Sequence, residues 1–180
     1  MMKKFLIASA ILAGLATSVA YGQCKHTHGE IDVNMVVDGQ ELIFEVISPL
    51  DNTVGFEYAP RNDAQKEQVR RMAEIMRGTQ AFILDSKPVC TLKHVKLSSD
   101  VIDSSLLGEK NLAQRPLVSD HGNLEAVYTY HCEKPDQLDK VTFRLFDTFK
   151  NMRKVHLQAL LPAGQRQAIL TSNRATFSWK

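Results

Sequence analysis

Near the start of the chain, side chains that bind metals recur at alternate positions. Cys24, His26 and His28 are followed at the same spacing by Glu30 and Asp32. Alternate side chains of an extended segment point to one face, so we expect these five to share a face. Thiolate, imidazole and carboxylate groups are the ligands of divalent transition metals. The spacing predicts metal binding; the alternative is a polar N-terminal segment with two incidental histidines.

Residues 1–22 have the composition of a secretory signal peptide. Lys3 and Lys4 precede an apolar stretch, residues 5–16, which is too short to span a bilayer. Cleavage after Ala20 or Gly22 would leave a mature chain that begins just before the histidines. The sequence therefore predicts an exported protein with one domain, residues 23–180, and no membrane insertion after signal cleavage.

The charge of the predicted mature chain is balanced. Removing residues 1–22 takes away two lysines and no acidic residue, which leaves 20 basic and 20 acidic side chains. A net charge of zero argues against nucleic acid or an anionic membrane as the main partner.

The hydrophobic pattern predicts an α+β, mainly β domain: an antiparallel β-sheet or sandwich with one packed helix. The helix is expected at residues 63–77, capped by Asn62 or Asp63 and ended by Gly78. Its apolar stripe is Val69, Met72, Ala73 and Met76. Strand-like segments occupy residues 31–37, 41–47, 81–84, 89–97, 124–132, 138–146, 155–161, 167–171 and 175–179. The connection at residues 98–122 is long enough to indicate a functional or disordered loop.

Three cysteines in an exported chain favour one disulfide and one remaining cysteine. Cys90 and Cys132 both lie in strand-like segments, so we pair them and assign Cys24 to the histidine cluster. Closing a loop of about 42 residues would stabilise the fold by about 4 kcal/mol in the chain-entropy model.

Several stretches of the chain resemble the ZrgA-type periplasmic zinc-binding proteins. The most specific is the block Val54-Gly55-Phe56-Glu57 with Ala59-Pro60. The matching stretches are residues 26–33, 48–60, 90–92, 121–126, 128–132, 145–146 with Phe149, 164–165 and 168–171. The resemblance covers the whole mature chain and implies a periplasmic protein that binds zinc and supports zinc acquisition or buffering, with a zinc importer as a possible partner. It also implies the disulfide between Cys90 and Cys132.

The chain departs from the pattern of that family in two places. Tyr58 stands where the family typically has a histidine, and the loop at residues 98–122 contains only one histidine, His121. A reservoir of loop histidines is therefore absent. Either one ordered site remains or metal binding has been weakened.

The predicted zinc ligands are His26, His28 and His121. The resemblance contributes His121, which matches the histidine at the start of the family's long strand. Zinc takes about four ligands in a tetrahedral array. The fourth is left open among Cys24, Glu30, Asp120, Glu125 and water.

The remaining histidines and the specific block receive structural interpretations. We expect His94 and His131 to be hydrogen-bonded sheet residues and His156 to lie on the opposite face. Tyr58, Asp51 and Glu57 are interpreted as structural, turn and sheet residues.

An enzymatic role is not expected, because the sequence lacks a nucleophile elbow, a phosphate-binding loop and a zinc-protease helix motif. The leading hypothesis is an exported zinc-binding protein whose binding weakens as the imidazoles protonate, near pH 6.5 for an unperturbed histidine. Two alternatives stay open: a metal-free structural or interaction module on the same fold, and copper handling through Cys24, His26 and His28.

Overall fold

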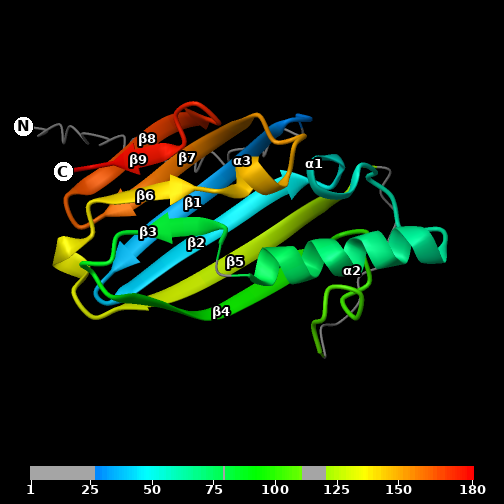
Figure 1. The fold of residues 1–180 in the computed structure, drawn as a ribbon, viewed down its shortest axis with the longest axis horizontal. Helices are drawn as coiled ribbons and strands as arrows, with labels where there is room; N and C mark the ends of the chain where they lie inside the picture. Colours follow the sequence, from blue (N-terminus) through cyan, green and yellow to red (C-terminus); the bar gives the residue numbers. More distant parts are fainter. Residues whose placement is uncertain (1–26, 79, 111–120) are drawn as a thin grey trace, which may run out of the picture.

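The computed structural model describes residues 27–78, 80–110 and 121–180, and in this part of the chain two β-sheets and one long helix form the fold. The larger sheet has six strands in the order β4-β5-β2-β1-β7-β8, and the smaller has the order β3-β6-β9 (Figure 1). The smaller sheet and helix α2 pack on the same face of the larger sheet, so the predicted mainly β fold with one packed helix is confirmed.

Strands outnumber helices among the described elements. The strands are β1 (Glu30–Asp38), β2 (Glu41–Pro49), β3 (Phe82–Leu84), β4 (Cys90–Ser99), β5 (Asn123–Cys132), β6 (Lys140–Phe143), β7 (Lys154–Leu161), β8 (Gly164–Thr171) and β9 (Thr176–Ser178). The helices are α1 (Asp51–Val54), α2 (Asp63–Arg77), α3 (Leu145–Thr148) and the 3-10 turn η1 (Pro135–Gln137).

Most neighbouring strands are antiparallel, as predicted, with one exception at the centre of the larger sheet. The Asp38-Gly39 signal produces the hairpin between β1 and β2, with Gly39 at a φ of 56°. Strand β1 also pairs with β7, and this pair is parallel, with Asp32 opposite His156. Residues 30–36 of β1 are therefore placed against a segment more than 120 residues away in the chain.

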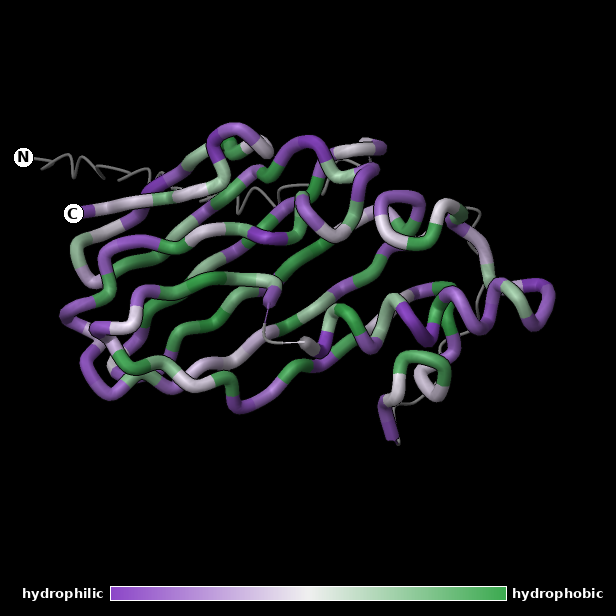
Figure 2. The backbone as a smooth tube through the Cα atoms, in the orientation of Figure 1, coloured by the Kyte–Doolittle hydropathy of each residue, from purple (hydrophilic) through white to green (hydrophobic). Residues whose placement is uncertain are grey.

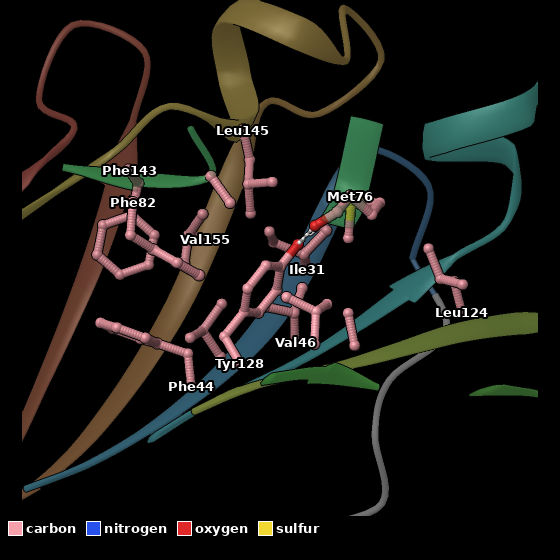
Figure 3. Close-up of a cluster of buried hydrophobic side chains, with 14 of the residues drawn as sticks. Ile31, Phe44, Val46, Met76, Phe82, Leu124, Tyr128, Phe143, Leu145 and Val155 are labelled. Carbon is pink, nitrogen blue, oxygen red and sulfur yellow. Dashed lines mark hydrogen bonds between the residues drawn. The ribbon is translucent and has the colours of Figure 1, made fainter. Parts of the chain in front are cut away.

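The core lies between the inner face of the larger sheet and the layer formed by α2 and the smaller sheet. Phe44 of β2 stacks on Phe82 of β3 with ring centroids 4.0 Å apart. Tyr128 of β5 reaches α2, where its hydroxyl donates a 2.7 Å hydrogen bond to the carbonyl of Met76 (Figure 3). Figure 2 shows apolar residues recurring along the strands of the larger sheet. The apolar residues that alternate along β5 and those of the stripe on α2 are therefore buried, as the sequence pattern predicts.

Helix α2 has the predicted bounds. The side chain of Asn62 accepts a hydrogen bond from the backbone N–H of Gln65, and Gly78 follows the last residue. The helix is 15 residues long, and no helix among the described residues is long and apolar enough to cross a membrane.

Two local predictions are wrong. Asp51 begins the short helix α1 and Glu57 lies in an irregular segment, so neither is a turn or sheet residue. In β4, the register shifts between Leu92 and His94. This irregularity interrupts the alternation of faces along β4, and His94 is exposed.

The predicted disulfide is confirmed. Cys90 and Cys132 are opposite each other in the β4–β5 pair and are covalently linked. The bond links the first residue of β4 to the last residue of β5, next to the turn between β3 and β4.

Candidate metal-binding site

The segment that carries His28 does not continue as an extended strand. His28 and Gly29 form a turn, and β1 begins only at Glu30. Gly29 has a φ of +83°, a conformation that residues with a side chain rarely adopt. The prediction that His28 shares a face with Glu30 and Asp32 is therefore wrong, because the turn redirects the chain between them.

Asn52 of helix α1 holds this turn in place. Its side chain accepts a 2.6 Å hydrogen bond from the N–H of Gly29, and donates to the carbonyl of Glu30 and the hydroxyl of Ser48. Asn52 is 2% exposed; its bonds to Gly29 and Ser48 are buried, and its bond to Glu30 is partly buried. The amide thus fixes the backbone on the C-terminal side of His28 to the end of β2 and to α1.

Glu57 follows α1 after a left-handed residue. Gly55 ends the helix at a φ of 76°, and its N–H bonds to the carbonyl of Asp51. This sharp ending turns the chain so that the Glu57 side chain lies at the base of the site, with 10% of its surface exposed. A carboxylate so buried requires partners.

His121 is brought to the same place by the glycine after it. The N–H of Gly122 donates a 2.8 Å hydrogen bond to the carbonyl of Glu57, and the carbonyl of Gly122 accepts from the N–H of Leu50. A Cβ at position 122 would lie 2.8 Å from the Glu57 carbonyl oxygen and 2.2 Å from a Val101 methyl group. Only glycine lets the start of β5 approach so closely.

The result is a cluster in which one buried carboxylate holds two histidines. Nε2 of His28 lies 2.9 Å from Oε1 of Glu57, and Nδ1 of His121 lies 3.0 Å from Oε2 of Glu57. Asp51 is at the edge, with Oδ2 3.8 Å from Nδ1 of His28. The imidazoles are 55% and 74% exposed, so they face solvent above the carboxylate.

The chemistry of these side chains suits zinc. The distances of 2.9 and 3.0 Å are those of hydrogen bonds, so the ring nitrogens that face Glu57 donate to it, and the other nitrogen of each ring would be the one to bind zinc. Within the described ranges, however, no three or more His, Cys, Asp or Glu side chains surround one point where a metal ion could sit. His28, Glu57 and His121 therefore form two pairs that share a carboxylate.

Other predicted ligands lie outside this cluster or outside the described residues. His26, Cys24 and Asp120 are not among the residues that the structure describes. The carboxylate of Glu30 is bound to Lys154 at 2.6 Å and His156 at 2.7 Å. These hydrogen bonds, first that of Lys154 and then that of His156, hold the pKa of Glu30 below its usual range.

The last candidate for the fourth ligand, Glu125, is also engaged elsewhere. Its carboxylate accepts a hydrogen bond from the hydroxyl of Ser98 on the neighbouring strand β4.

His131 and Tyr58 make structural contacts. His131 pairs with Glu41 at 3.3 Å, as expected for a sheet histidine. The Tyr58 hydroxyl accepts a hydrogen bond from Gln65, and the Arg61 guanidinium lies 3.8 Å from the centre of its ring. The residue that stands in the place of a histidine thus supports the start of α2.

Glu57 is the site residue that the sequence interpretation missed. In a strand, the exposure of this segment would alternate, whereas the burial of Glu57 depends on Gly55 and on the approach of Gly122. The available signal is its place in the most specific block of the chain, two residues after Gly55 and three before Pro60.

Comparison with known proteins shows which family this chain belongs to. Among curated proteins, none matches the chain. The family model described as "ZrgA family zinc uptake protein" matches residues 25–179, which include His28, Glu57, His121 and both disulfide cysteines. The match covers most of the chain and gives it a zinc-related role. The chain belongs to the ZrgA family of zinc uptake proteins.

Proposed function

We propose that this protein is exported to the periplasm, binds Zn²⁺ reversibly and contributes there to zinc acquisition or buffering. The proposed ligands are His28 and His121, with Glu57 beside them and His26 completing the set. Zinc is the cargo in this proposal, and no chemistry on another substrate is involved. Delivery to a zinc importer is the partner relationship that the family description favours.

The observation that carries the proposal is the Glu57 carboxylate between two histidines from distant parts of the chain. His28 and His121 are separated by 93 positions, yet each lies within 3.0 Å of the same buried side chain. A preorganised arrangement of this kind lowers the entropic cost of gathering ligands around an ion.

Each side chain has a distinct part in binding. The exposed imidazoles can take an ion from solvent without opening the fold, since only Glu57 is buried. The negative charge of Glu57 offsets part of the charge of Zn²⁺ and, as a hydrogen-bond acceptor, orients both rings. Imidazole binds zinc in its neutral form, so protons compete with the ion at acid pH.

Zinc titration of the mature protein by calorimetry tests this proposal. We expect the His28→Ala/His121→Ala variant to lose at least about 100-fold in affinity, and Glu57→Gln to lose about 10- to 100-fold, as for partners that orient ligands. His94→Ala is the matched control, because His94 is exposed on β4 and far from this cluster in the chain. Wild-type affinity in the double variant would refute the site.

Two further measurements separate zinc binding from the alternatives. Affinity measured at pH 7.5 and 5.5 should fall at the lower pH, and equal values would exclude histidine ligands. Elemental analysis of the purified protein should find zinc in near-stoichiometric amount. Copper in its place would support the copper hypothesis, and no metal together with no binding would support a metal-free module.

A further inference from the structure

A cavity of about 540 Å³ lies at the open edge between the two sheets. It is lined by residues of β3, the turn after it, the start of β4 and Tyr130 of β5, and it shares no lining residue with the proposed zinc site. Its apolar walls include Phe82, Leu84, Leu92 and Tyr130. This volume is within the range of pockets that bind small molecules.

The rim of the cavity contains two exposed hydrophobic side chains and one residue with a strained backbone. Ile83 and Val89, two of the five large hydrophobic side chains exposed among the described residues, both line it. Val89 also has a φ of 51°, which is strained for a β-branched residue. Its backbone is held there, since its N–H bonds to Ser86 and its carbonyl accepts from Glu133. Strain of this kind gathers at binding sites.

Tyr130, one of the residues that line the cavity, also has a buried hydroxyl without a hydrogen-bond partner among the described residues. Tyr128 and Tyr130 lie two residues apart on the inner face of β5. The Tyr128 hydroxyl donates to Met76, whereas the Tyr130 hydroxyl has no partner among the described residues. Tyr130 is 4% exposed, and burial raises its pKa to about 12, so it stays protonated and can donate. A buried donor without an acceptor is costly, which makes this one an available contact for a ligand.

We propose that this cavity binds a small, neutral and largely apolar molecule with one hydrogen-bond acceptor, such as a ketone or ester carbonyl, that accepts a hydrogen bond from the Tyr130 hydroxyl. A neutral ligand fits because the one carboxylate in the lining, Asp85, is paired with Lys140 at 3.3 Å. The hydroxyl is closed off from solvent, so the ligand reaches it by displacing lining side chains, and binding changes the surroundings of β3 and of the start of β4.

Two probes of nearly the same shape test the hydrogen bond. Acetophenone has a carbonyl oxygen where α-methylstyrene has a CH₂ group. Each is titrated into the ¹⁵N-labelled, disulfide-bonded protein and followed by NMR. We expect shifts in Phe82–Leu84 and at the start of β4, and about fivefold tighter binding of acetophenone, the contribution of one neutral hydrogen bond.

Tyr130→Phe and Tyr128→Phe form a matched pair of variants. Tyr130→Phe should abolish the preference for acetophenone and leave the melting temperature unchanged or higher, because it removes an unpartnered hydroxyl. Tyr128→Phe should keep the preference and lower the melting temperature, because it removes the bond to Met76.

Three outcomes would overturn the proposal. The first is no binding of either probe, and the second is binding whose shifts lie elsewhere. The third is a Tyr130→Phe variant that melts lower and keeps the preference, which would mean that a trapped water satisfies the hydroxyl.

Discussion

Replacing Asn52 with alanine tests whether the proposed zinc site depends on a buried amide outside it. The Asn52 side chain bonds to the backbone of Gly29, the residue after His28. Asn52→Ala removes an acceptor and two donors that link the start of β1, the end of β2 and α1. We expect a loss of stability and, separately, a loss of zinc affinity.

The size of the stability loss follows from the three bonds. The Gly29 N–H becomes a buried donor without its acceptor, which costs about 1–3 kcal/mol, and each of the other two bonds contributes about 1 kcal/mol. Entry of water into the space left by the side chain offsets part of this loss, so we expect about 3 kcal/mol. Because the turn then no longer holds His28 beside Glu57, zinc affinity should fall about 10-fold, as when groups that orient a ligand are removed.

Urea denaturation and zinc calorimetry measure the two effects on the same variant. Asn151→Ala is the control. Asn151 is exposed, and its side chain donates a hydrogen bond to the carbonyl of Asp51, the neighbour of Asn52 in α1. Its loss should cost at most about 0.5 kcal/mol, as for a surface substitution. The reasoning would be refuted if the free energy of unfolding of Asn52→Ala were within about 0.5 kcal/mol of wild type, or if its zinc affinity were unchanged.

Three further predictions concern other contacts. Gly122→Ala should destabilise the protein by about 2 kcal/mol and weaken zinc binding, because its Cβ would collide with neighbours at 2.2 and 2.8 Å; thermal melting and calorimetry measure both. Replacing Cys90 and Cys132 with serine should cost about 4 kcal/mol in urea denaturation, and an unchanged midpoint would contradict the loop-entropy estimate. For Glu109, burial alone would raise its pKa, but a backbone N–H and Arg77 hold the pKa below its usual range. Glu109→Gln should therefore cost about 1 kcal/mol above pH 5, and the difference from wild type should vanish as the pH falls through that lowered pKa in denaturation curves.

The parts of the fold that could be predicted from the sequence depend on local signals. The bounds of α2 follow from a capping asparagine, a helical stripe and a glycine, all within 17 residues. The β1–β2 hairpin follows from Asp38-Gly39 in the same way. The parallel pairing of β1 with β7 could not be predicted, because nothing near either strand specifies a partner more than 120 positions away.

The candidate site was predicted in part for the same reason. The alternating pattern around His28 suggested a strand, but the left-handed Gly29 and the distant Asn52 impose a turn. His121 was identified through resemblance, whereas its contact with Glu57 depends on the close approach of Gly122. Residue types near one another in the sequence indicated metal chemistry, and contacts between distant segments decided which side chains meet.

The site therefore contains exposed residues that are proposed to bind zinc and buried residues that link chain segments, and variants can distinguish the two kinds. His121 is 74% exposed, and Glu57 keeps His28 as a partner when His121 is replaced by alanine. This variant should therefore reduce zinc affinity with only a small effect on the metal-free fold. Asn52 and Gly122 are buried links between segments, and their replacement should reduce both. Zinc at 100 times its dissociation constant would stabilise the folded protein by about 2.7 kcal/mol. A His121→Ala variant that loses this zinc-dependent gain while its metal-free stability is unchanged would place zinc binding in the cluster above Glu57, and a variant that keeps the gain would exclude His121 as a ligand.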